Sequence, residues 1–266
     1  MVISIERKTL EYYLNLKYPV TIEEGMAITT QEAWCERNGF SGNSLRLMIP
    51  TYVRQVCEEI AFVAREDKRV DKRSGVSQRL PISVLENVIS NAERRALHQR
   101  SSLTVPRISD IYTAMPSITG KLELEYEGEV KGADYVGREL IRTAIAQTFD
   151  QYFHGANLQQ VVQWFDLGGS IKVPDTAAAA EVIDELKPIQ GLMEKLTAVG
   201  VKPKDSVEVQ VSAAEFLLEG LHAHKRIGRN EERVFSAGEK QVRRAEAAAG
   251  RDREEPPFGR SRRGFN

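Results

Sequence analysis

The chain has 266 residues, of which 41% are hydrophobic and 28% charged, and its formal net charge at pH 7 is −1. This length and composition fit an ordinary globular protein with one large or two modest domains and exclude a globally disordered chain. No apolar run approaches the roughly 20 residues that span a bilayer, and Glu6, Arg7 and Lys8 stand where a signal peptide needs apolar residues. We therefore expect a cytoplasmic protein.

Cysteine and histidine give no sign of a disulfide or a metal site. Cys35 and Cys57 are the only cysteines, and their apolar or helix-forming neighbours predict buried thiols. His222 and His224 lie two residues apart, so on a helix they point in different directions and cannot share a metal ion. We expect neither a metal nor a cofactor in this chain alone.

Helical periodicity dominates from residue 50 onward. A first helix opens at Pro50 and ends in a charged run over 65–73, followed by a turn at 74–75. A second helix begins near Pro81, with a capping box predicted over 83–86. The apolar residues expected on the buried faces of these helices are Val53, Val56, Ile60, Phe62, Val63, Ala64, Val84, Leu85, Val88, Ile89, Ala92 and Leu97. The polar residues expected on the opposite face of the second helix are Glu93, Arg94, Arg95 and Gln99.

Short and long helices alternate over the next sixty residues or so. The segment 106–115 predicts a short helix that Pro116 stops. Apolar and acidic residues alternate over 121–130, which indicates either a strand or an irregular acidic connection. One apolar stripe over 135–152 predicts a long helix, and 157–165 predicts a short helix capped by its first residue, an asparagine.

Caps and prolines bound the last predicted helices. Asp175 can cap an alanine-rich helix through Leu186, and Pro188 separates it from a helix that ends near Gly200. A second capping box, Ser-Ala-Ala-Glu, opens a final helix over 212–224. The chain is therefore predicted to be mainly α.

The C-terminal part is basic and poor in apolar residues. From Lys225 to the end there are 12 Lys or Arg against 7 Asp or Glu, and 251–266 reads RDREEPPFGRSRRGFN. Such a composition cannot build a packed core, so we expect disorder from about residue 250. We interpret this tail as a solvated terminus, with binding to an acidic partner or to nucleic acid as the alternatives.

The sequence contains no P-loop. The pattern GxxxxGK[ST], in which glycine amides wrap phosphates, is absent, and Gly120-Lys121 is the only Gly-Lys pair. Val-Ile-Asp-Glu at 182–185 has the form of a Walker B ending, but the alanines before it predict a helix rather than a buried strand. We therefore do not interpret it as a Walker B motif.

Residues 64–96 carry the most specific pattern, AREDKRVDKRSGVSQRLPISVLENVISNAERRA. This segment resembles the lid of AAA+ ATPases of the MoxR and magnesium-chelatase type, in which a helix, a Gly-x-Ser-x-Arg loop and an alanine- and leucine-rich helix follow one another. Residues 105–116 resemble the closing helix of that lid, and 16–34 its link to the ATPase core. GKLELEYEGE resembles the region beyond the lid in related bacterial proteins, so the resemblance covers most of residues 10–235.

The resemblance implies a nucleotide-sensing role for Arg79, in a loop with Gly75, Ser77 and Gln78. The sensor-2 arginine of AAA+ proteins stands just before a lid helix and contacts the γ-phosphate of ATP. A guanidinium suits this role because it is permanently charged and forked. From the residues alone we interpret Arg79 as a structural pairing or capping residue, and the resemblance favours sensor 2.

The resemblance also implies four regions: a remnant linking core to lid over 1–45, a lid-type helical bundle over 46–120, a C-terminal helical domain over 121–227 and a basic, largely disordered tail over 228–266. The ATPase core would lie before residue 1, and the Asp-Arg pair that ends it in the family is missing near Lys8. We expect a split or truncated gene product, or a partner that supplies only the lid, and no ATP hydrolysis by the chain alone.

Two hypotheses of function follow. In the first, the chain is the lid and C-terminal module of a ring-forming AAA+ ATPase, in which it senses nucleotide and binds an AAA+ core, neighbouring subunits or a client protein. ATP and Mg²⁺ would then be held by the partner core. In the second, the chain is a stand-alone helical protein-interaction module. We expect self-association through the uncovered lid, no membrane contact, and no nucleic-acid binding, because Phe258 and Phe265 form no interleaved aromatic platform.

Overall fold

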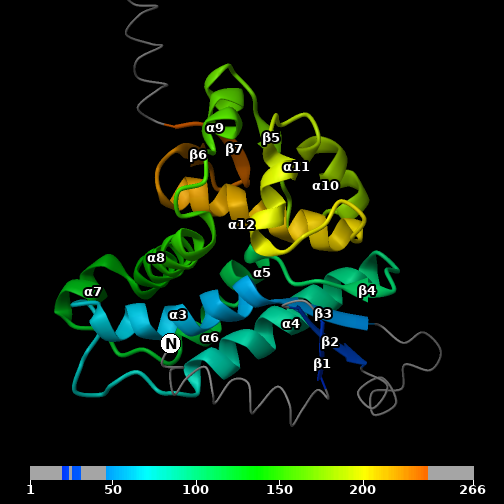
Figure 1. The fold of residues 1–266 in the computed structure, drawn as a ribbon. Coiled ribbons are helices and arrows are strands. Elements are labelled where there is room, and N and C mark those ends of the chain that lie inside the picture. The colour runs from blue at the N-terminus through cyan, green and yellow to red at the C-terminus, as the bar shows by residue number, and fades with distance from the viewer. Residues whose placement is uncertain (1–19, 24–25, 31–45, 239–266) are drawn as a thin grey trace, which may run out of the picture.

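The computed structural model describes residues 20–23, 26–30 and 46–238. Within these ranges the chain is mainly α-helical with two small sheets (Figure 1). Cys35 and most of the predicted remnant over 1–45 lie outside the described residues, and so does the part of the tail for which we predict disorder.

The helices of the described residues are α3 (Thr51–Glu66), α4 (Leu80–His98), α5 (Ile108–Thr113), α6 (Met115–Thr119), α7 (Tyr126–Lys131), α8 (Ala133–Phe153), α9 (Gln159–Asp166), α10 (Ala179–Leu186), α11 (Leu192–Lys195) and α12 (Val207–Ala223), with a 3-10 turn η1 (Leu196–Val199). The first sheet has the order β1 (Val20–Glu23), β2 (Met26–Thr30), β3 (Arg46–Pro50), β4 (Leu103–Thr104), and only its β3–β4 pairing is parallel. The second sheet is antiparallel, with the order β5 (Ile171–Lys172), β7 (Val234–Ala237), β6 (Ile227–Arg229).

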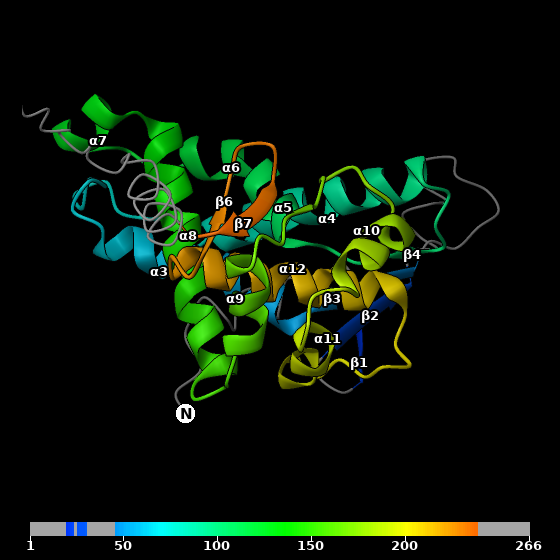
Figure 2. The same cartoon turned by 90° about the horizontal axis from the view of Figure 1, so that it is seen from above.

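The helices form two groups that α8 connects (Figures 1 and 2). One group holds α3, α4 and α6 with the first sheet, and the other holds α9 to α12 with the second sheet. Helix α8 packs against α3 on one side and α12 on the other. One cluster of buried side chains therefore runs from Leu47 to Phe235, across the boundary expected between residues 120 and 121.

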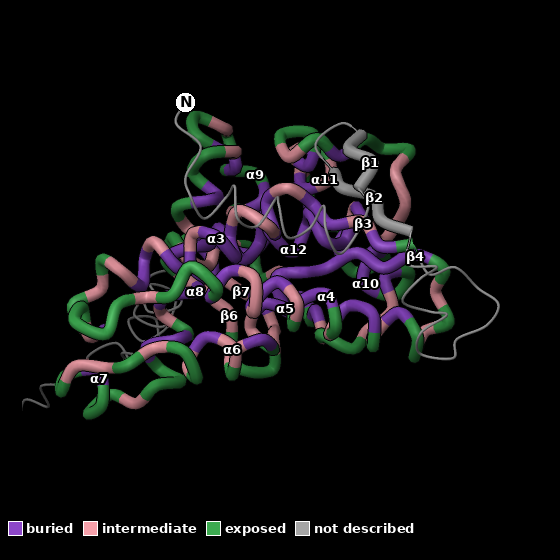
Figure 3. The backbone as a smooth tube through the Cα atoms, turned by 90° about the horizontal axis from the view of Figure 1, so that it is seen from below, coloured by how far each residue is buried: buried purple, intermediate pink, exposed green. Residues whose placement is uncertain are grey.

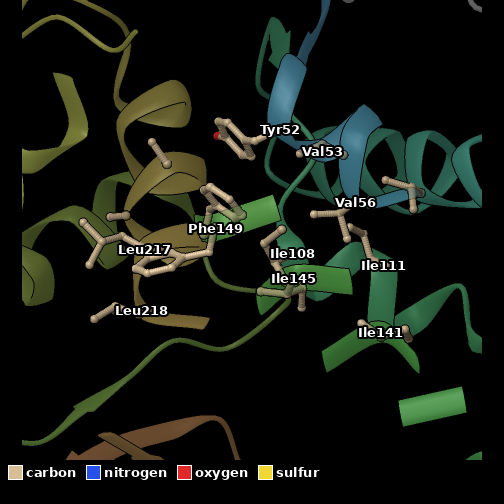
Figure 4. Close-up of a cluster of buried hydrophobic side chains, with 14 of the residues drawn as sticks. Tyr52, Val53, Val56, Ile108, Ile111, Ile141, Ile145, Phe149, Leu217 and Leu218 are labelled. Atoms are coloured by element: carbon tan, nitrogen blue, oxygen red, sulfur yellow. The ribbon is translucent and has the colours of Figure 1, made fainter. Parts of the chain in front are cut away.

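Helix α12 is the most deeply buried helix of its group (Figure 3). Every residue over 211–221 is buried. Phe216 stacks on Tyr52 of α3 with ring centroids 4.6 Å apart, and the Phe149 ring of α8 lies 6.2 Å from it. Tyr52 and Phe149 lie among the apolar side chains shown in Figure 4. Aromatic residues from three helices thus hold the two groups together.

Most of the predicted helices are confirmed. The apolar stripes predicted α3, α4 and α8 correctly, and Cys57 is buried as expected. Five side chains depart from the predicted faces. Phe62 is only partly buried, and Leu97 and Tyr135 are 45% and 49% exposed. Glu93 and the Arg95 side chain, both expected on a polar face, are 6% and 9% exposed. The other apolar residues predicted on the buried face of α4, from Val84 to Ala92, are buried as expected, so the departures on this helix lie in its C-terminal half.

Both predicted capping boxes are wrong. Helix α4 begins at Leu80, so Ser83 lies inside its first turn. Helix α12 begins at Val207, so Ser212 and Glu215 lie in its interior, where they bond to other elements. The Ser-x-x-Glu pattern has a capping role only where the serine is non-helical, and here both serines lie inside helices that begin earlier in the chain.

Three loop predictions also need correction. Pro116 does not end the helical region, because it occupies the first turn of α6, where proline is tolerated. Asp175 does not cap α10, which begins at Ala179. Residues 126–131 of the acidic segment form helix α7, while Leu124 makes an isolated antiparallel bridge.

The tail does not begin at residue 228. Strands β6 and β7 form a hairpin on β5, and Phe235 of β7 is fully buried. The expected boundary at 227–228 therefore lies inside a sheet, because these charged residues are held by ion pairs that composition does not reveal.

Candidate functional site

The predicted sensing loop is a fixed turn between α3 and α4. Gly75 adopts a φ of 69°, in the left-handed region that favours glycine. The Arg65 guanidinium donates to the Val76 carbonyl at 3.3 Å, and the Arg79 amide donates to Ser77 Oγ at 3.2 Å. These two hydrogen bonds fix the loop to the end of α3 and to the start of α4.

This loop presents its predicted site residues to solvent. Gly75, Ser77, Gln78 and Arg79 are all exposed. Arg79 occupies the N-cap of the 19-residue α4. Among the ion pairs of the described residues, none involves its guanidinium. Two positive features, a cation and the N-terminal end of a helix dipole, thus lie together and favour an anion between them.

A second cluster of charges, which the sequence did not predict, lies buried beneath the β6–β7 hairpin. Glu215 Oε1 accepts hydrogen bonds from the Ser109 amide and from Arg233, each at 2.6 Å. Glu219 Oε1 accepts from Arg229 at 2.5 Å and from Arg233 at 3.1 Å. Burial raises the pKa of Glu219 against the opposing effect of the two arginines. These contacts anchor the hairpin to α12 and α5.

The same network extends to the N-terminus of α5. Arg95 binds both carboxylate oxygens of Asp110, at 2.5 and 3.0 Å, and burial raises the pKa of Asp110. Arg107 is buried and donates to the Ala177 carbonyl at 3.2 Å. Burial, aided by the nearby charge of Arg95, lowers the pKa of Arg107 to about 10. The network therefore connects α4, α5, α12 and the second sheet.

A cavity of about 430 Å³ opens beside this network, between α5, α8 and the hairpin. The Arg229 guanidinium lies over the Tyr112 ring, 4.6 Å from its centroid. Arg229 Nε and Ser109 Oγ are buried, and neither has a hydrogen-bond partner among the residues that the structure describes. The charged residues that line the cavity are Asp134, Arg138, Asp175, Arg229, Glu231 and Arg233. Because three cations face three anions, the lining selects no single charge.

The described residues contain no cluster of candidate metal ligands and no membrane-spanning helix. No group of His, Cys, Asp and Glu there could hold a metal ion. His224 lies 2.8 Å from Asp150 as an ion-pair partner. Burial lowers the pKa of His222 to about 4, and the positive charge of Arg229 adds a smaller effect in the same direction. Among the same residues no helix is both long and apolar enough to cross a membrane.

Sequence reasoning missed the buried network, although one signal was present. Glu215 and Glu219 interrupt an otherwise apolar run, four residues apart, and Arg229 and Arg233 repeat that spacing. Glutamates at this spacing lie on one face of a helix, so a buried helix requires cations opposite them. Arg229 and Arg233, which supply these cations, both lie in the range that we assigned to the tail.

The described residues define the class of the protein as mainly α with two small sheets. No protein-family model, curated protein or solved structure matches the chain.

Proposed function

We propose that the chain is the lid and C-terminal module of a cytoplasmic AAA+ ATPase of the MoxR or magnesium-chelatase type. It senses nucleotide through Arg79 and binds an AAA+ core, neighbouring subunits or a client within a ring. The observation that supports this is the loop before α4, which holds an exposed guanidinium at a helix N-terminus, with no ion pair to any residue of the described ranges. A forked cation at that position suits the γ-phosphate.

The proposal assigns the phosphate cradle, ATP and Mg²⁺ to the partner core. The sequence has no GxxxxGK[ST] pattern. A charge-assisted hydrogen bond from one arginine contributes only about 1.5–3 kcal/mol, which is too little to hold a nucleotide by itself. The chain alone is therefore expected not to hydrolyse ATP.

The test combines the purified chain with a MoxR-type core made without its own lid and measures ATP turnover. Arg79→Ala is expected to lower turnover about tenfold or more, because about 1.4 kcal/mol of lost phosphate binding is a factor of ten. Arg73→Ala, which removes another exposed arginine from the same connection, is the matched control and should leave turnover unchanged. A rate that does not respond to the chain or to Arg79 contradicts nucleotide sensing.

The second candidate is a helical protein-interaction module with no nucleotide role. The exposed apolar side chains of α7, Tyr126 and Val130, favour it. The turnover assay separates the two functions, because an interaction module leaves the rate of the core unchanged. Sedimentation over micromolar concentrations tests the expected self-association, and a monomer throughout contradicts it.

A further inference from the structure

Helix α7 and the first turn of α8 form an exposed apolar surface with acidic edges, here called the α7 patch. Tyr126, Val130 and Tyr135 are 79%, 69% and 49% exposed, and they are three of the five exposed large apolar residues in the described ranges. The exposed carboxylates beside them are Glu123, Glu127 and Glu129. The patch lies at one end of the molecule (Figures 2 and 3).

The α7 patch is held in place by the connection between α3 and α4. The Asp71 amide donates to the Glu123 carbonyl and the Glu125 amide donates to the Arg69 carbonyl, each at 2.9 Å. Gly128 lies so close that a Cβ there would come within 2.6 Å of the Arg69 carbonyl oxygen. The backbone is thus fixed on its inner side while the apolar side chains face outward. An exposed apolar surface on a fixed backbone is typical of a site that binds a protein segment.

We propose that the α7 patch binds the C-terminal segment of the same chain, residues 256–266. This segment, PPFGRSRRGFN, has three arginines, two phenylalanines and no acidic residue. Its arginines match the three exposed glutamates, and its phenylalanines match the apolar centre of the patch. The segment covers the patch and competes with any other partner for it.

The length of the chain allows this contact. The described part ends at Gly238, and 239–255 connect it to the segment. Seventeen residues span up to about 56 Å, whereas a folded body of this size has a radius of gyration of about 16 Å. A short tether also raises the effective concentration to about millimolar, so a weak contact is sufficient. The inference does not rest on the proposed nucleotide role.

Hydrogen–deuterium exchange of the full chain tests the contact. In the variant Arg260→Glu/Arg262→Glu/Arg263→Glu, amides over 123–132 are expected to exchange about fivefold faster than in the wild type, with α12 unchanged. Lys240→Glu/Arg243→Glu/Arg244→Glu makes the same charge change nearer the folded body and should exchange like the wild type. Glu127→Arg/Glu129→Arg, added to the first variant, is expected to restore slow exchange.

Three results would overturn the proposal. The first is unchanged exchange over 123–132 in the Arg260/Arg262/Arg263 variant. The second is an equal acceleration in the control variant, which would indicate a general charge effect. The third is wild-type protection that increases between about 1 and 50 µM protein, which would assign the contact to a second copy. An unchanged circular dichroism spectrum shows that each variant is folded.

Discussion

Arg233 ties the β6–β7 hairpin to the helical core, and Arg233→Met removes that tie while keeping most of the aliphatic volume. The guanidinium donates to Glu215 at 2.6 Å, to Glu219 at 3.1 Å and to the Val173 carbonyl at 3.1 Å. After the substitution Glu215 keeps one donor, the Ser109 amide. Even before it, the Glu215 Oε2 atom has no hydrogen-bond partner within the described part of the chain. A buried carboxylate is then left without its cation.

The expected loss of unfolding free energy is about 3 kcal/mol. Removing one partner of a buried ion pair costs about 3–5 kcal/mol. The lower end applies because Glu219 keeps its bond to Arg229 and Glu215 keeps its bond from the Ser109 amide. Adding Glu215→Gln removes the uncompensated charge, so the double variant should recover about 1 kcal/mol or more.

Urea unfolding followed by circular dichroism measures these values. The matched control is Lys172→Met, which removes an exposed 3.5 Å ion pair with Glu232 from the same sheet and should cost less than about 0.5 kcal/mol. If Arg233→Met unfolds within about 0.5 kcal/mol of the wild type, the network does not hold the hairpin and the reasoning fails.

Three further predictions concern the core and its pH dependence. Gly220→Ala should lower the free energy of unfolding in urea by about 2–3 kcal/mol, because the new Cβ would overlap the Phe149 ring. Adding Phe149→Leu should recover part of this loss. A loss near zero for Gly220→Ala would contradict the close packing. Tyr52→Phe should cost about 1 kcal/mol, since it removes the 2.8 Å bond to Ser212, and equal melting temperatures would argue against that bond. Folding lowers the pKa of His222 from 6.5 to about 4, so on acidification the unfolded chain binds a proton at His222 before the folded chain does. The contribution of His222 to stability is therefore complete above pH 6.5 and is lost as the pH falls toward 4. His222→Gln should lose less stability than the wild type between pH 7 and pH 5, whereas parallel losses would show that His222 is not responsible.

Local periodicity predicted α3, α4 and α8 well because each of them buries one stripe. In α8 the stripe of Val136, Leu140, Ile141, Ala144 and Ile145 repeats at helical spacing and is fully buried. The loop over 74–79 was also predicted correctly as a turn between two helices, since glycine and serine there give a local turn signal. Its role in nucleotide sensing stays a prediction.

The parts that sequence reasoning missed depend on partners far along the chain. Residues 211–221 of α12 are all buried, so the middle of this helix has no single apolar stripe that periodicity could detect. Arg229 and Arg233 look like tail charges until Glu215 and Glu219 are placed opposite them. Such pairings come from tertiary structure, which neither composition nor a capping pattern contains.

The hydrogen bond between Tyr52 and Ser212 joins residues that are 160 positions apart, and it has a consequence for synthesis. At about 5–20 residues per second, a ribosome completes Ser212 about 8–30 s after Tyr52. During that interval the side of α3 that Phe216 will cover has no partner and is open to other nascent chains. The newly made N-terminal half is therefore a natural client for a holding chaperone until α12 emerges.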